Sequence, residues 1–123
     1  MASVLRVIQI IWYFDYTKDI KRAIKYKDFT EYNYKLTFSH SESNSLSCDI
    51  AIKNKINVAV VFEKLPYNFC NIPVINGDQS DDIMLEYSGV ILGLKAKGDA
   101  RTDKSGFVIS KDNLNCNYDG LPF

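Results

Sequence analysis

The sequence contains few of the residues from which catalytic and metal-binding sites are usually built. It has one histidine, His40, and three cysteines, Cys48, Cys70 and Cys116, with no C-x-x-C spacing. Transition-metal sites need clustered His and Cys ligands, so we expect no metal centre. Neither a glycine-rich phosphate loop nor a G-x-S-x-G motif occurs. We therefore expect no cofactor and no enzymatic activity.

Long apolar segments and secretion signals are also missing. The hydrophobic stretch from Val4 to Phe14 is interrupted by Arg6 and Gln9, and it is too short to span a bilayer. It has no basic leader and no small-residue cleavage site, so no signal peptide is expected. An odd number of cysteines makes a disulfide framework unlikely. These features predict a protein of the reducing cytoplasm that does not contact a membrane.

An excess of charge of either sign is absent as well. Fifteen Lys and Arg balance fifteen Asp and Glu, so no global field attracts nucleic acid or an anionic membrane. The charges are nevertheless unevenly distributed: residues 1–64 carry ten basic and seven acidic side chains, and residues 65–123 carry five and eight. The length of 123 residues indicates one domain.

The stretch from Cys48 to Phe62 predicts a central β-hairpin. Ile50 and Ile52 alternate with polar or small residues, and a tight turn is expected at residues 53–55. The following run from Ile56 to Phe62 is rich in β-branched residues and ends apolar on both faces. Such a strand is usually covered on both sides, so we expect it in the middle of the sheet.

The rest of the chain predicts more strands and one short helix. Thr17 is a candidate N-cap for a helix that ends near Lys27, with Ile20, Ala23 and Ile24 on one face. Further strands are expected at Val4–Tyr13, where a buried helix is the alternative, and at Phe29–His40, Ile83–Tyr87, Val90–Ala96 and Phe107–Ser110. About seven strands and one N-terminal helix predict a mainly β, α+β domain over residues 1–123, either a β-sandwich or an open barrel.

Two groups of side chains are candidates for a chemical site. Cys48 follows His40 by eight residues, a pair that would suit nucleophilic catalysis. No nucleophile signature surrounds them, so we interpret His40 as a surface or rim residue and Cys48 as a buried apolar one. The acidic stretch with Asp78, Asp81, Asp82 and Glu86 departs from the calcium-binding loop pattern. It is either a solvated turn or an acidic patch for a basic partner.

A basic segment with nearby tyrosines suggests a further alternative. Single-strand binders combine cations with aromatic stacking faces. A solvated helix face explains the same cations equally well. The cations are Lys18, Lys21, Arg22, Lys25 and Lys27, and the tyrosines are Tyr26, Tyr32 and Tyr34.

Without catalytic groups, the sequence favours a protein that binds. In general character it resembles small bacterial or phage proteins that dock on one partner, such as the immunity proteins that neutralise a toxin, although no motif carries this resemblance. The leading hypothesis is a non-enzymatic inhibitor that covers the active surface of a basic toxin or nuclease. Its predicted contact residues are Asp78, Asp81, Asp82, Glu86, Tyr67 and Phe69. The alternatives are a nucleic-acid-binding β-barrel that uses helix 18–27 and a β-sandwich that binds a small ligand.

Overall fold

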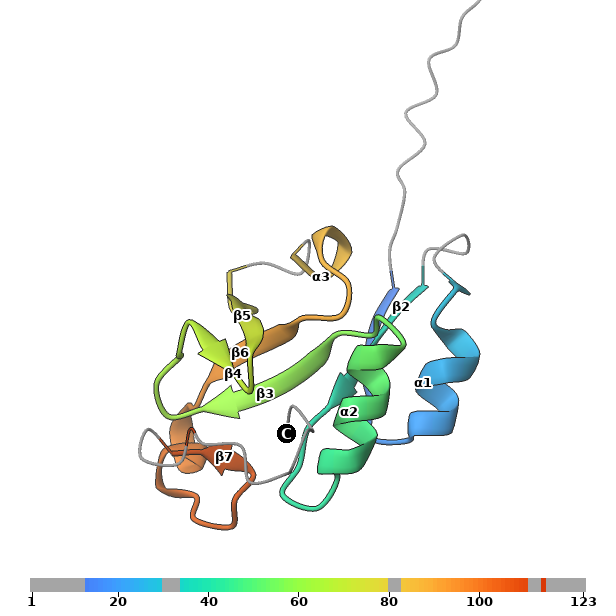
Figure 1. Cartoon of the computed structure of the whole chain (residues 1–123). Helices are drawn as coiled ribbons and strands as arrows, with labels where there is room; N and C mark the ends of the chain where they lie inside the picture. The colour runs from blue at the N-terminus through green and yellow to red at the C-terminus, as the bar shows by residue number, and fades with distance from the viewer. Residues whose placement is uncertain (1–12, 30–33, 80–82, 111–113, 115–123) are drawn as a thin grey trace, which may run out of the picture.

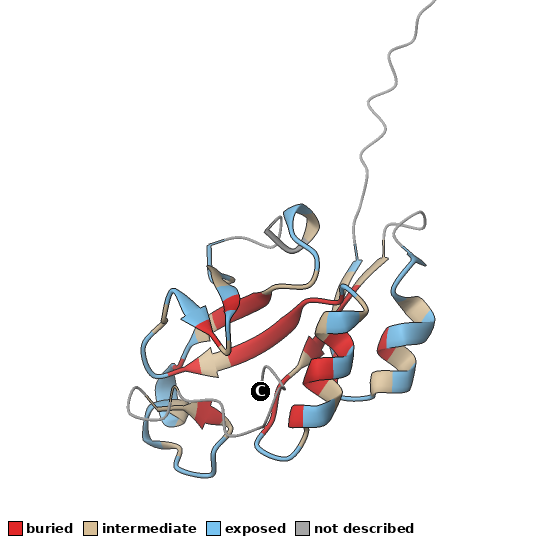
Figure 2. Ribbon diagram, viewed as in Figure 1, coloured by how far each residue is buried: buried red, intermediate tan, exposed pale blue. Residues whose placement is uncertain are grey.

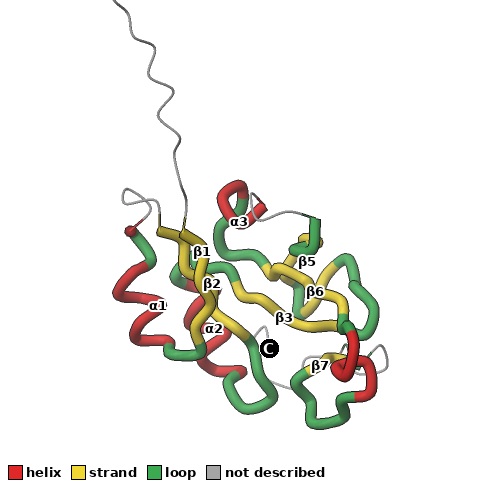
Figure 3. The backbone as a smooth tube through the Cα atoms, turned by 180° about the vertical axis from the view of Figure 1, so that it is seen from behind, coloured by secondary structure: helices red, strands yellow, loops and turns green. Residues whose placement is uncertain are grey.

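The computed structural model describes residues 13–29, 34–79, 83–110 and 114, and these form one open sheet with helices on one face (Figure 1). Seen from behind, the strands lie in front of the helices α1 and α2 (Figure 3). The helical elements are α1 (Ile20–Tyr26), α2 (Ser45–Lys53), the short α3 (Ile83–Glu86) and the 3₁₀ helix η2 (Gly98–Thr102). The strands are β1 (Tyr13–Thr17), β2 (Tyr34–Ser39), β3 (Val58–Phe62), β4 (Asn68–Phe69), β5 (Ile72–Asn76), β6 (Ile91–Lys95) and β7 (Val108–Ile109).

The sheet has seven strands in the order β1-β2-β3-β6-β5-β4, and β7 pairs with β3. Every described strand pair is parallel except β4 with β5. On one edge of β3, the first residues pair with β2, through Phe38 and Val58, and the last pair with β7, through Phe62 and Ile109. The mainly β, α+β class and the number of strands are confirmed. The described strands form one sheet and not the two stacked sheets of a sandwich.

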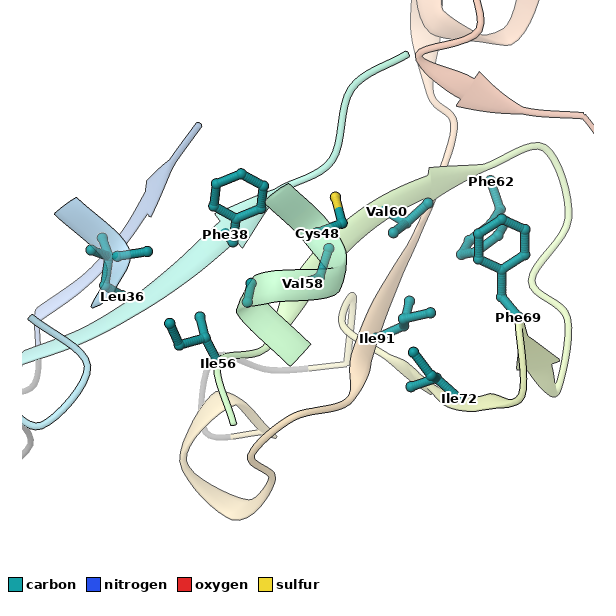
Figure 4. Close-up of a cluster of buried hydrophobic side chains, with 12 residues drawn as sticks. Leu36, Phe38, Cys48, Ile56, Val58, Val60, Phe62, Phe69, Ile72 and Ile91 are labelled. Carbon is teal, nitrogen blue, oxygen red and sulfur yellow. The ribbon is translucent and has the colours of Figure 1, made fainter. Parts of the chain in front are cut away.

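The core lies between this sheet and its two helices (Figures 2 and 4). Side chains at alternate positions of β2 and β3 point to the helices, because a strand turns successive side chains to opposite faces. Ala23 of α1 and Ala51 of α2 are fully buried and let the helices approach closely. The largest fully buried side chains of this cluster are Phe38, Phe62, Ile91, Val58 and Val60. The predicted central position of the strand that ends at Phe62 is confirmed.

The predicted hairpin at residues 48–62 is wrong in its first half. Ser45–Lys53 is the helix α2, and its buried residues Ser45, Cys48 and Asp49 follow helical spacing. A short apolar run fits both periods, so its alternation did not distinguish a strand from a helix. An ion pair of 2.9 Å between Lys53 Nζ and Asp49 Oδ2, one helical turn apart, adds to the helix. The turn after it is present, with the positive φ at Lys55.

The predicted strand at Ile83–Tyr87 is also wrong. Residues 83–86 form α3, in the crossover that joins the parallel strands β5 and β6. The buried Asn57 organises this crossover: its amide donates to the Tyr87 carbonyl at 2.8 Å, and its side-chain oxygen accepts from the Val90 N–H at 3.2 Å. A long-range contact of this kind overrides a weak local alternation.

The other predicted elements mostly hold. The N-terminal helix is confirmed as α1, although its N-cap is Asp19, whose side chain accepts from the N–H groups of Lys21 and Arg22. The predicted strands ending near Ala96 and Ser110 are β6 and β7. Most of the predicted Val4–Tyr13 strand lies outside the described residues. No helix among the described residues has the length and apolar character that crossing a bilayer requires.

One cysteine departs from expectation. Cys70 is disulfide-bonded, whereas Cys48 is a buried free thiol. Cys70 and Asn71 form the turn between β4 and β5, with φ of 54° and 65°, as the tightest hairpin turns require. Disulfides persist mainly in oxidising compartments. The location of the protein in the cytoplasm therefore stays a prediction, and the disulfide at Cys70 argues against it.

The disulfide can be tested by counting thiols. We expect the denatured protein to titrate fewer thiols before reduction than after it, when all three cysteines react. A Cys48→Ala variant serves as the control, because it removes the free thiol from both counts. Equal counts with and without reductant would show that Cys70 is not bonded.

Candidate functional site

An aromatic cavity opens where β1 and β2 begin and α1 ends. We call it the aromatic hollow. Because β1 and β2 are parallel and pair Tyr13 with Tyr34, the amino ends of both strands and the carboxyl end of the intervening helix meet at the same edge of the sheet. The cavity has a volume of about 510 Å³ and is lined by Tyr13, Arg22, Tyr26, Phe29 and Tyr34.

Arg22 is held in place within this hollow. Its Nη2 donates to Asp15 Oδ2 at 2.8 Å and to the Tyr34 hydroxyl at 2.7 Å. The hydrogen bond from Arg22, with a second from the Tyr16 N–H, lowers the pKa of Asp15 below its ordinary value. Burial, together with the contact to Asp15, raises the pKa of Tyr34. Arg22 and Asp15 are therefore both charged at neutral pH, and the guanidinium is preorganised.

The rings of the hollow are arranged edge to face. The centroids of Tyr26 and Phe29 lie 4.8 Å apart at 79°, and those of Tyr26 and Tyr34 lie 6.0 Å apart at 60°, as aromatic pairs prefer. Tyr13 is 63% exposed and Phe29 is 36% exposed. The described residues of the hollow thus offer ring surface, hydroxyl groups and one fixed cation to an incoming group.

A family model described as Gene product 88 matches residues 1–111 of the 123. The chain belongs to the Gene product 88 family. The match extends over all the described strands and helices, and the family's description states no activity or ligand. No curated protein and no solved structure matches the chain.

In this Gene product 88 protein, the predicted acidic surface is divided. Asp78 follows the carboxyl end of β5, whereas Glu86 precedes the amino end of β6. These strands are parallel, so the two carboxylates belong to opposite edges of the sheet. Asp78 accepts hydrogen bonds from the Lys95 N–H at 3.0 Å and from Lys97 Nζ at 3.2 Å, and these bonds lower its pKa. Asp81 and Asp82 lie outside the described residues.

The two predicted aromatic contact residues differ in their exposure to solvent. Tyr67 is 95% exposed, but Phe69 is buried and packs on Phe62 with the ring centroids 5.4 Å apart. The proline-bounded segment forms the sheet edge β4–β5, and Phe69 sits on its inner side. A partner can therefore reach Tyr67 and cannot reach Phe69.

His40 and Cys48 lie in the interior of the protein. Both are buried, so the prediction of a rim position for His40 is wrong. Burial lowers the pKa of His40 to about 4 and raises the pKa of Cys48 to about 12. The Cys48 thiol donates to Asn44 Oδ1 at 3.4 Å. At neutral pH the thiol is protonated, so it does not supply a thiolate nucleophile. In the described part of the chain, no group of three or more His, Cys, Asp or Glu side chains could hold a metal ion.

A second cavity opens at the carboxyl end of the sheet, beside β3 and β7. Its volume is about 360 Å³, and acidic, basic and hydroxyl side chains share its lining. The carboxylate of Asp103, in the wall of this cavity, already accepts hydrogen bonds from its own loop, from the Ser105 hydroxyl and the Val108 N–H. Parallel sheets often bind ligands at this end, but the mixed lining here indicates no ligand class.

Sequence reasoning identified part of the aromatic hollow. Tyr26, Tyr34 and Arg22 were considered together as a nucleic-acid surface, whereas Tyr13 and Phe29 were assigned only to strands. The signal that links these residues is the position of the tyrosines in one β-α-β unit: Tyr13 begins β1, Tyr26 ends α1 and Tyr34 begins β2. It becomes informative only when the strands are known to be parallel.

Proposed function

We propose that this protein acts by binding another protein and not by transforming a substrate. The observation that carries this proposal is the aromatic hollow, a surface cavity whose described lining residues include four aromatic rings and one arginine. Tyrosine and arginine are enriched among the residues that dominate protein interfaces, and such residues cluster around well-packed pockets. The contact surface proposed here is therefore the β1–α1–β2 edge, and the acidic stretch is not part of it.

The accessibility and the preorganisation of the lining support the same assignment. Tyr13 and Phe29 are 63% and 36% exposed, so a partner can reach ring surface of the hollow. Arg22 is already oriented by Asp15 and Tyr34, which reduces the entropy lost when it binds. A partner's apolar or aromatic side chain would enter the hollow, and a hydrogen-bond acceptor on it would meet Arg22.

Inhibition of a toxin or nuclease is the finer part of this proposal. A protein that seats a partner's side chain in such a hollow also covers the surface around that side chain. An inhibitor of the immunity-protein type would use the contact in this way. Of the six contact residues predicted from the sequence, Tyr67 keeps its role as an alternative, because it is 95% exposed.

Single-stranded nucleic acid is the second candidate ligand. Lys25 Nζ lies 5.3 Å from the centroid of the Tyr26 ring, and cations beside aromatic faces are what stacking binders use. The net charge of zero gives no long-range attraction for a polyanion. A protein partner is therefore favoured. The crosslinking experiment described next would also detect a nucleic acid.

Two exposed tyrosines, Tyr13 and Tyr67, provide a matched test. A photo-crosslinking amino acid at position 29 should capture the partner in producing cells, in a product sensitive to protease and resistant to nuclease. With that partner purified, Tyr13→Ala should weaken binding by about 2 kcal/mol, close to 30-fold. Tyr67→Ala removes the same side chain from a more exposed position and should change the affinity less than about twofold.

Two results would contradict this assignment. A larger loss with Tyr67→Ala than with Tyr13→Ala would place the contact at the β4–β5 edge. A nuclease-sensitive crosslink, together with binding of a labelled oligonucleotide that Tyr13→Ala weakens, would favour the nucleic acid.

A further inference from the structure

A further cavity opens at the amino end of the sheet, and three of its six described lining residues are lysines. We call it the lysine hollow. Its volume is about 260 Å³, and it lies between the ends of α1 and α2, the start of β2 and the segment after α3. The described residues that line it are Lys27, Asp28, Lys35, Asn54, Lys55 and Ser88.

The charges around this cavity do not balance. Asp28 is the one carboxylate among the described lining residues, and its Oδ2 lies 3.8 Å from Lys27 Nζ. No ion pair joins Lys35 or Lys55 to a carboxylate in the described part of the chain. The described lining residues thus include three lysines and one carboxylate, which leaves an excess of positive charge among them.

Lys35 is the least expected of these lysines. It lies on β2 between Tyr34 and Leu36, and its side chain is half-buried. Burial is the one cause that shifts its pKa, and it lowers it. A lysine that loses hydration without gaining a counterion is unfavourable for the apo protein. An anion in the hollow would supply the missing partner.

The helix ends account for only part of the cluster. Lys27 is the C-cap residue of α1, and Lys55 follows Asn54, the C-cap of α2. Basic side chains near helix carboxyl ends interact favourably with the helix dipole, so these two lysines have a structural role in any case. Lys35 belongs to a strand, and the same explanation does not extend to it.

We propose that the lysine hollow is a binding site for a phosphate group. Lysine ammonium groups bind phosphate as point charges, and the Asn54 amide and Ser88 hydroxyl add neutral donors. Asn54 Nδ2 uses one hydrogen on the Ile50 carbonyl, at 2.8 Å, and has a second one to offer. The group is either a free phosphate or the phosphodiester of a larger ligand. The two cavities have no described lining residue in common, so the phosphate site is argued independently of the proposed protein contact.

The test is a titration of the whole chain with inorganic phosphate at constant ionic strength, followed by backbone amide NMR. We expect saturable shifts at Lys35, Asn54, Lys55 and Ser88. Lys35→Gln should weaken phosphate binding about tenfold, because a hydrogen bond to a charged group is lost. Lys35→Arg keeps the charge and should retain the affinity within about threefold.

Lys64→Gln is the matched control. It removes an exposed lysine just beyond the carboxyl end of β3, at the opposite edge of the sheet, and should leave the affinity within about twofold. If Lys35→Gln fails to fold, Lys55→Gln tests the same cavity from an exposed position. A parallel titration with dimethyl phosphate separates the two sources, because it saturates only if a phosphodiester fits.

Two outcomes would overturn the proposal. One is a linear shift with either anion that never saturates. The other is an equal loss of affinity in Lys35→Gln and Lys64→Gln, which would show general charge screening. If no protein partner is captured at position 29 while phosphate binding saturates, the proposed function alone is refuted. If a partner is captured while phosphate binding never saturates, the phosphate site alone is refuted.

Discussion

Replacing Phe38 by alanine is expected to lower the free energy of unfolding by about 3–5 kcal/mol. Phe38 is fully buried on β2, where it pairs in register with Thr17 of β1 and Val58 of β3. Its ring lies in the cluster between the sheet and the helices (Figure 4). Removing the ring takes apolar surface out of the core and leaves a cavity that neighbouring strands cannot close. Since small domains are stable by only about 5–15 kcal/mol, this loss is a large share of the total.

The measurement is urea denaturation, in which the midpoint should fall while the slope stays constant. Leu46→Ala is the control, because Leu46 is 62% exposed on α2 and should change stability by less than about 0.5 kcal/mol. If both variants lose the same stability, Phe38 is not part of a close-packed core.

Stability should also fall as the pH is lowered from 6.5 toward 4, because of His40. Burial lowers the pKa of His40 from 6.5 to about 4 in the folded protein, whereas the unfolded chain keeps the ordinary value. Between these two values the unfolded state binds more protons, so protonation favours unfolding. Nearby Glu42 raises the pKa and Lys18 lowers it, and both effects are smaller than that of burial.

The expected loss is about 3 kcal/mol across the whole window, because the pKa falls from 6.5 to about 4 and each pH unit corresponds to about 1.36 kcal/mol. Urea denaturation between pH 7 and pH 4.5 should show most of it. Asp15 and Asp78 have pKa values below 3.8, so their contribution is lost only at lower pH. His40→Gln has no titrating group and should show a much flatter dependence. An unchanged slope in this variant would mean that His40 is not the titrating group.

Local patterns predicted some elements well. Helix α1 has an apolar face, an acidic cap and a basic last turn within one short segment, so the local preferences agree with the final structure. The run ending at Phe62 is apolar on both faces, and a strand of that kind is stable only when it is covered on both sides. These segments needed no knowledge of their neighbours.

The segments from Ser45 to Lys53 and from Ile83 to Glu86 were predicted wrongly for a common reason. Each contains only a few apolar residues, which fit a period of two as well as a period of 3.6. In the structure both segments are crossovers between parallel strands. The pairing of distant strands decided their conformation.

The candidate contact residues show the same division. Phe69 and Tyr67 look alike in the sequence, but one lies on the inner side of the edge strand and the other in solvent. Asp78 and Glu86 are eight residues apart in the chain and belong to opposite edges of the sheet, because a crossover separates them.

By itself, the sequence determined the mainly β class, the first helix, the central strand and the scarcity of catalytic residue types, because these follow from local period and composition. Only the tertiary structure decided that the strands run parallel, and therefore that Tyr13, Tyr26, Phe29 and Tyr34 line one hollow around Arg22. The direction of strand pairing depends on contacts between residues far apart in the chain, which no local pattern records.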